Sequence, residues 1–192
     1  MKNIFKNIII QVYLVFLNIF KVFLGISFIV NLLETVRPLF IGAILSRFGA
    51  TIGDKINFKG RYSFDNVFGD QDSKNDFSNL SIGNRCVIGK GVFFDLTNKI
   101  ILENEVGIGA NSMLMTHIDL SEMPMSKLYP RKSEPIRIGE GTFLGAHVVV
   151  IHGVTLGKCC VVAAGSVITQ SFPEYSLIAG VPARLVRKIE LK

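Results

Sequence analysis

The chain has 192 residues, which is enough for one domain with a sizeable hydrophobic core. A hydrophobic content of 49% and a mean hydropathy of +0.43 are together high for a soluble domain. The net charge of +6 suits a nucleic acid, an anionic membrane or a phosphorylated cofactor. Because no basic and aromatic groove and no nucleic-acid motif is present, we expect no nucleic-acid partner.

Residues 7–33 are rich in Ile, Leu, Val and Phe and contain one charged side chain, Lys21. The apolar run is long and lacks a small-residue cleavage site, which argues against a signal peptide. On a helical wheel its polar residues, Gln11 and Asn18 among them, fall in one narrow stripe. Such a helix fits the membrane interface, a tilted membrane span, or packing against the rest of the protein or other copies of the chain.

Pro38 is expected to end helical structure, because proline cannot continue a helix. Residues 48–53 are expected to begin a different kind of structure. We therefore predict two parts. Residues 1–45 form a hydrophobic helical segment that associates with a membrane. Residues 46–192 form a second domain.

Within this second domain, aliphatic residues recur with a period of six. That period fits neither a helix of 3.6 residues per turn nor the two-residue alternation of a strand. It is typical of a solenoid in which each hexad forms one short strand and a corner, with the aliphatic side chain inside and a glycine or small residue turning the corner at positive φ. The periodic positions are Ile82, Ile88, Phe94 and Ile100, then Leu102, Ile108 and Leu114, then Ile138, Leu144, Val150, Leu156, Val162 and Ile168.

The hexads, the segment 141–168 and the closing sequence AGVPARLVR at residues 179–187 resemble the hexapeptide-repeat acyltransferases, in particular the sugar and polysaccharide O-acetyltransferase branch. The resemblance covers about residues 48–190. It implies an all-β solenoid, a left-handed parallel β-helix with three hexads per triangular coil, following the N-terminal hydrophobic α-helix and ending in a short tail. It also implies a homotrimer that uses acetyl-CoA as donor substrate.

Two stretches interrupt the repeat, at residues 60–79 and 117–135, and we predict that they project as loops that carry function. The first contains four aspartates, whose spacing matches no calcium loop, so we expect a solvated loop and no metal. The second contains three prolines, at 124, 130 and 135, which are expected to rigidify it without forming regular structure. The resemblance implies that this loop covers the acceptor pocket of the neighbouring subunit.

His117 stands at the mouth of the second interruption. Transfer of an acetyl group to a hydroxyl needs a base, and histidine titrates in the right range to take the proton and return it to the thiolate. The resemblance implies that His117 is this base. Asp119 is a candidate to orient the imidazole or contact the substrate, although a backbone carbonyl could orient the ring equally well.

The repeat register places Asp95 beneath Met115 and beside His117, because a coil has eighteen residues and the frame slips by two after Ile100. The resemblance implies that Asp95 binds the acceptor sugar; the alternative is an aspartate that caps a corner.

For acetyl-CoA, the resemblance implies a groove between adjacent solenoids. Small residues would admit the pantetheine chain, and arginines would meet the phosphates. Glutamine replaces the family's frequent lysine at one of these positions, Gln170, which weakens that phosphate contact. The residues are Ala146, Ala164, Thr169, Gln170, Arg184 and Arg187.

Three histidines, His117, His147 and His152, provide an alternative, because three is the number that a zinc site needs. The γ-class carbonic anhydrases are also hexapeptide solenoids. Against this alternative, their pattern usually sits one residue closer to the preceding corner than His147 does, and the closing sequence has no purpose in them. A non-catalytic scaffold trimer is the other alternative, and no metal is our expectation.

The cysteines Cys86, Cys159 and Cys160 lack metal spacing and are expected to be small buried or corner residues of a reduced protein. We therefore predict a membrane-associated, trimeric O-acetyltransferase that modifies a sugar hydroxyl of a surface polysaccharide or its lipid-linked precursor. We place it at the cytoplasmic side of the cell membrane, peripheral or anchored by the N-terminal helix.

Overall fold

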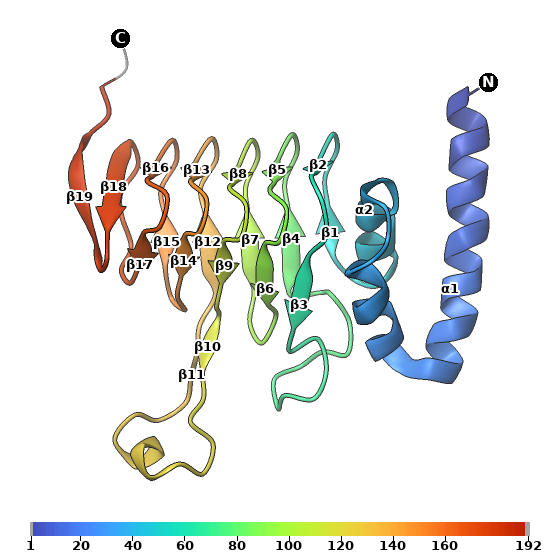
Figure 1. Ribbon diagram of the computed structural model, residues 1–192, viewed down its shortest axis with the longest axis horizontal. Coiled ribbons are helices and arrows are strands. Elements are labelled where there is room, and N and C mark those ends of the chain that lie inside the picture. The colour runs from blue at the N-terminus through green and yellow to red at the C-terminus, as the bar shows by residue number, and fades with distance from the viewer. Residues whose placement is uncertain (1, 191–192) are drawn as a thin grey trace.

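The computed structural model describes residues 2–190, with side chains from residue 8 onward. A pair of helices lies at one end of an elongated stack of coils, and a hairpin projects from the side of that stack (Figure 1). The parallel solenoid and the N-terminal helix predicted by the sequence are confirmed.

Three sheets form the three sides of the solenoid, and each hexad contributes one strand of only two or three residues. Within these three sheets, all pairings are parallel except that of β19 with β18. Sheet A contains β1 (Thr51–Ile52), β4 (Leu80–Ile82), β7 (Ile100–Leu102), β12 (Ile136–Ile138) and β15 (Thr155–Leu156). Sheet B contains β2 (Asn57–Phe58), β5 (Val87–Ile88), β8 (Gly107–Ile108), β13 (Phe143–Leu144), β16 (Val161–Val162), β18 (Ser176–Gly180) and β19 (Ala183–Lys188). Sheet C contains β3 (Ser63–Asp65), β6 (Phe93–Asp95), β9 (Met113–Leu114), β14 (Val149–Val150) and β17 (Val167–Ile168).

The periodic aliphatic side chains fill the inside of the prism, as predicted. Every one of the thirteen is at most 2% exposed. They stack in columns, since Ile82 pairs with Leu102, Leu102 with Ile138 and Ile138 with Leu156. Each buried side chain of this size contributes about 1.5–3 kcal/mol, so the columns are the main source of the solenoid's stability.

The glycines that follow these aliphatic residues have a different role from the one expected. They do not adopt positive φ; that conformation occurs two residues later in the corner, for example at His147, with φ 57. A Cβ atom on Gly145 would lie 2.5 Å from the backbone nitrogen of Ala164 in the next coil. Glycine is therefore needed because adjacent coils approach each other too closely for a side chain.

Two helices precede the first coil, α1 (Lys2–Leu33) and α2 (Pro38–Arg47). Helix α1 is broken at Gly25, whose φ of 75° and ψ of 179° are not helical. The expectation that Pro38 ends helical structure was wrong, because Pro38 opens α2. The first helical turn tolerates proline, since the N–H that proline lacks would have no helical partner there.

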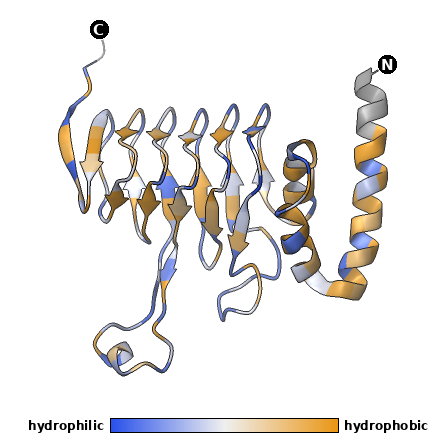
Figure 2. Cartoon of the chain, viewed as in Figure 1, coloured by the Kyte–Doolittle hydropathy of each residue, from blue (hydrophilic) through white to orange (hydrophobic). Residues whose placement is uncertain are grey.

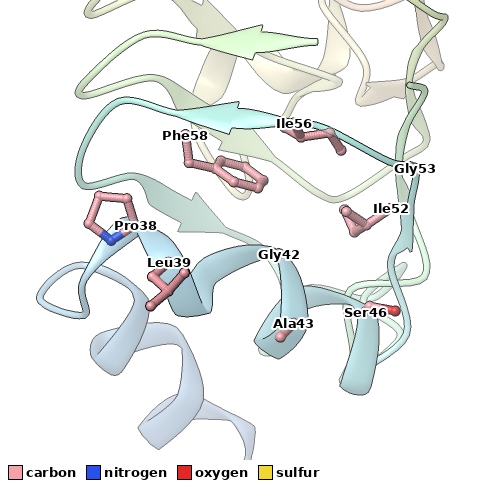
Figure 3. Close-up of a pocket in the computed structure, with 9 residues that line it drawn as sticks. All are labelled: Pro38, Leu39, Gly42, Ala43, Ser46, Ile52, Gly53, Ile56 and Phe58. Carbon is pink, nitrogen blue, oxygen red and sulfur yellow. The ribbon is translucent and has the colours of Figure 1, made fainter. Parts of the chain in front are cut away.

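Helix α2 covers the end of the solenoid, where the first coil would otherwise expose its core. Its buried residues are Ile41, Ile44 and Leu45. A groove remains between α2 and the first coil, with Leu39 and Ala43 on one side and Ile52 and Phe58 on the other (Figure 3). The helix therefore acts as a cap for the column of apolar side chains.

Both interruptions of the repeat contain more regular structure than expected. Residues 63–65 of the first form β3, the third side of the first coil, and the irregular part follows Asp65. In the second, β10 (His117–Ile118) pairs antiparallel with β11 (Lys132–Ser133), and a short 3₁₀ helix, η1 (Pro124–Lys127), forms the tip. The predicted absence of regular structure there was wrong, because Pro124 occupies the first turn of that short helix.

Candidate functional site

His117 lies at the corner between sheets C and A, where β10 leaves the coil. Its side chain is 19% exposed, and its Nδ1 atom lies 2.7 Å from Oδ2 of Asp95. The backbone N–H groups of Thr116 and His117 donate to the same oxygen, at 2.7 and 3.0 Å. The base of the hairpin is thus fixed to the coil below through one carboxylate.

Asp95 reaches this position because of the register between coils. Phe94 pairs with Leu114, which confirms that Asp95 stacks beneath Met115. The Asp95 carboxylate is 1% exposed, and its other oxygen accepts hydrogen bonds from Asn66, at 2.9 Å, and from the backbone and hydroxyl of Thr97. Since both oxygens are engaged, Asp95 faces His117 and the coil rather than an open acceptor pocket.

The hydrogen bonds determine the charge of Asp95. Burial raises the pKa of this carboxyl, but hydrogen bonds from His117, Asn66 and Thr97 outweigh burial and hold the pKa below its ordinary value. An ionised Asp95 accepts the Nδ1 proton of His117, so the neutral ring carries its lone pair on Nε2. This is the tautomer that a general base needs, and the aspartate holds it in one orientation.

Asp119 lies elsewhere than beside the imidazole. Its Oδ2 is 3.2 Å from Nε of Arg131, on the returning limb of the hairpin. Arg131 also contacts Asp70, at 2.7 Å, and Asp72 in the first interruption. Asp70, Asp72 and Asp119 therefore surround the guanidinium of Arg131. The role of orienting the imidazole, which was considered for Asp119, belongs to Asp95.

A polar pocket of about 370 Å³ opens between the two interruptions, next to the His117–Asp95 pair. Thr97, whose hydroxyl is 3.2 Å from Nδ1 of His117, forms part of its wall, as do Lys74 and Lys99. Asn98 donates to the Ser133 hydroxyl, at 3.1 Å, and so joins the coil corner to the hairpin. The hairpin, the first interruption and the corner after β6 together shape the surroundings of His117.

The residues assigned to acetyl-CoA lie on the later coils. Ala146 and Ala164 stack at the corner between sheets B and C, whereas Thr169 and Gln170 follow β17 at the corner that carries His117. Arg184 and Arg187 are exposed on β19, where neither forms a salt bridge with any of residues 8–190. The assigned positions therefore lie at three places on one chain, namely two different corners and β19.

The three histidines do not share one corner of the solenoid. His147 lies at the corner between sheets B and C, whereas His117 and His152 follow strands of sheet C. Nδ1 of His152 lies 3.3 Å from Oε2 of Glu134. Among the described residues, no three His, Cys, Asp or Glu side chains of one chain are grouped so that they could hold a metal ion. Cys86 and Cys160 are buried and Cys159 occupies a corner, as expected.

Sequence reasoning missed three residues of this site: Asn66, Thr97 and Arg131. Thr97 stands two residues after Asp95, and that spacing is typical of a side chain that hydrogen-bonds locally. Asn66 and Arg131 lie in the interruptions, where no period fixes which residues meet.

Comparison with known proteins supports this description. Residues 135–170 match the protein family described as the hexapeptide repeat of succinyl-transferase. Galactoside O-acetyltransferase of Escherichia coli (strain K12) is 33% identical over 116 residues, which cover 57% of each chain. The chain thus spans little more than half the length of this curated relative.

Two solved structures share the fold. The hexapeptide-repeat acetyltransferase from Vibrio cholerae O1 biovar eltor, complexed with acetyl coenzyme A, matches with a TM-score of 0.72 and 22% identity, over 86% of this chain and 85% of that one. A maltose O-acetyltransferase from Clostridium difficile 630 matches with a TM-score of 0.73 and 20% identity, over 86% of this chain and 85% of that one. The chain therefore contains a hexapeptide-repeat segment, is similar in sequence to galactoside O-acetyltransferase and is similar in fold to the hexapeptide-repeat acetyltransferases.

Proposed function

We propose that this protein is an O-acetyltransferase that moves an acetyl group from acetyl-CoA to a sugar hydroxyl. The observation that carries the proposal is the His117–Asp95 pair, in which a buried carboxylate holds the imidazole at the base of the hairpin. The names of the sequence relative and of the structural neighbours, which are acetyltransferases, support the same reaction class.

In this reaction Nε2 of His117 accepts the proton of the acceptor hydroxyl as its oxygen attacks the thioester carbonyl. A carbon–oxygen bond forms, the carbon–sulfur bond breaks, and the proton passes from His117 to the departing thiolate of CoA. Asp95 keeps the ring in one tautomer and stabilises the imidazolium that forms in between.

The donor would be held by the later coils. We assign the phosphates of CoA to Arg184 and Arg187, whose guanidinium groups are exposed on β19, and the pantetheine chain to the corner at Ala146 and Ala164. No metal takes part in this scheme.

We further propose a homotrimer of left-handed β-helices. The outer face of sheet B supports a subunit contact, because it presents the exposed apolar side chains Val87, Phe143 and Val161 in one row, with Gly107 between Val87 and Phe143. In a trimer, the corner that carries Ala146 and Ala164 of one subunit can face the corner that carries His117 of another. This arrangement would join the two halves of the site that one chain keeps apart.

The acceptor would be a surface polysaccharide or its lipid-linked precursor at the cytoplasmic side of the cell membrane. The apolar N-terminal helix supports this choice, because a membrane-associated enzyme meets a lipid-linked acceptor at a raised local concentration. Pro38–Arg47 would then connect the membrane-associated part to the catalytic coils.

Purified protein, acetyl-CoA and a panel of sugar acceptors test the proposal through the release of free CoA thiol. His117→Ala should lower turnover by roughly a hundredfold to ten-thousandfold while leaving acetyl-CoA affinity nearly unchanged. His152→Ala is the matched control and should keep its activity. Near-normal turnover of His117→Ala would remove the assigned base. A zinc content that is lost with activity in His152→Ala would favour the carbonic-anhydrase alternative.

A further inference from the structure

The outward face of α1 is an apolar surface without a partner in the described chain. Its large hydrophobic side chains are between 45% and 81% exposed, which is the reverse of what a helix on a soluble protein shows (Figure 2). We call these residues the outer face of α1: Ile8, Ile9, Val12, Val15, Phe16, Ile19, Phe20, Val22, Phe23 and Leu24.

Two residues of the polar stripe of α1, Asn18 and Lys21, face the protein, whereas Gln11 is exposed. Nζ of Lys21 lies 5.2 Å from the ring centroid of Phe48, and Nε of Arg47 donates to Oδ1 of Asn18, at 3.3 Å. Leu14 and Leu17 are buried beside them. Because Asn18 and Lys21, together with Leu14 and Leu17, face the body of the protein, the helix presents much of its apolar side outward.

The break at Gly25 determines how this surface can meet a membrane. Residues 8–33 are long and apolar enough to cross a membrane, with a mean hydropathy of 2.2, but they do not form one straight helix. The straight apolar part, residues 8–24, is about 25 Å long, which is shorter than a hydrocarbon core of about 30 Å. After the break, Ile29 and Leu33 are fully buried in the protein and cannot extend a span.

Positive charge gathers at the same end of the molecule. Residues 1–61 hold eight Lys and Arg against two Asp and Glu, whereas residues 62–192 hold thirteen of each. The whole net charge of +6 therefore belongs to the part of the chain that carries the outer face of α1. Such a charge favours a surface of anionic headgroups.

We propose that the outer face of α1 lies flat in one leaflet of a bilayer with anionic headgroups, with the helix axis parallel to the membrane plane. The apolar side chains enter the boundary between headgroups and acyl chains, and the basic residues of the first coil and the helix ends face the headgroups. The solenoid then stands on the membrane at its α2 end. This inference concerns attachment, and it stands or falls independently of the proposed reaction.

The absence of tryptophan from the chain permits a direct test with single-tryptophan variants. The full-length variants Ile9→Trp, Phe16→Trp and Phe23→Trp are reconstituted into vesicles of phosphatidylcholine and phosphatidylglycerol, and quenching by lipids brominated at different depths is measured. All three should be quenched at one shallow depth. Tyr13→Trp is the matched control, because Tyr13 faces inward with its ring 5.0 Å from that of Phe40, and it should be protected.

Two results would overturn the proposal. A graded depth, with Phe16→Trp deepest, would mean that α1 spans the bilayer. Protection of all three tryptophans would mean that a second copy of the chain covers the outer face. In addition, the double variant Phe16→Glu and Val22→Glu should no longer float with vesicles. Its circular dichroism should remain that of the parent, since both side chains are more than half exposed. The parent should bind vesicles of phosphatidylcholine alone about tenfold more weakly.

Discussion

Between two neighbouring coils, the residues that pair are related by the same offset along the chain on all three sides, whereas the contacts within the two interruptions follow no such rule. Ile138 pairs with Leu156, and the neighbouring columns repeat the same relation. In the interruptions, Arg131 reaches back to Asp70 and Asn98 reaches forward to Ser133. Steric fit between identical backbones decides the first set of contacts, and individual charges and hydrogen bonds decide the second.

This difference implies a division of labour. A substitution in a coil should change stability, because every coil rests on the next. A substitution at the corner between sheets C and A should change catalysis, because the groups around His117 come from three separate segments.

Gly145→Val should lower the free energy of unfolding by about 3 kcal/mol, because the new Cβ would meet the backbone of the next coil. Gly165→Asn is the control. Its φ of 73° suits asparagine, and a Cβ there meets nothing within 4 Å, so its stability should stay close to the parent's. Denaturant unfolding followed by circular dichroism measures both. Equal losses would show that the coils are not held by close stacking.

Asp95→Asn should lower turnover roughly tenfold to a hundredfold and leave the KM for acetyl-CoA unchanged, because the amide cannot hold the imidazole as the carboxylate does. Asp65→Asn is the matched control, since Asp65 lies in the preceding coil at the position that pairs with Asp95, and it is exposed. Steady-state kinetics of acetyl transfer distinguish the two. An unchanged turnover in Asp95→Asn would show that Asp95 does not position His117.

Arg131→Ala should raise the KM for the acceptor several-fold and cost about 1 kcal/mol of stability, because Asp70, Asp72 and Asp119 lose their shared partner. Arg85→Ala removes a more exposed ion pair, that with Glu105, and should leave both quantities nearly unchanged. Acceptor saturation curves and urea unfolding provide the measurements. An acceptor KM equal to the parent's would show that the two interruptions need not be joined.

The smallest expected effect is on the stability of the protein at acid pH. The pKa of Asp95 is lower in the folded protein than in the unfolded chain, so the ionised carboxylate stabilises the fold at pH values above the unfolded pKa, about 3.9. This contribution is lost as the pH falls through the lower, folded pKa. The stability difference between the parent and Asp95→Asn should therefore be constant near neutrality and shrink below about pH 4. Urea unfolding at a series of pH values measures it, and a difference that does not change with pH would contradict the prediction.

The contrast between coils and interruptions also explains what the sequence predicted. The period of six identified the inward residues, and counting in coils placed Asp95 beneath Met115, which the pairing of Phe93 with Met113 confirms. A period carries this information because each coil rests on the last. The steric role of Gly145 was missed, since a sequence does not show how closely two coils approach.

The interruptions and the helices were harder to predict. Asp119 was placed near His117 because it is close in sequence, yet it turns to Arg131, and no local pattern shows which aspartate an arginine will choose. The polar stripe of α1 was predicted from the helical wheel. The wheel does not show, however, that Asn18 and Lys21 face the protein.

The hairpin leaves the solenoid and returns to it at one point, and this geometry has an evolutionary consequence. The N–H of Glu134 donates to the carbonyl of Thr116, at 2.9 Å, so the two ends of the insertion are joined. The next coil begins as though nothing had been inserted, with Ile136 paired to Ile100. Doubling the length of such a loop costs only about 0.6 kcal/mol of closure entropy. The segment between Asp119 and Arg131 can therefore change in length and sequence in the course of evolution while His117 stays in place.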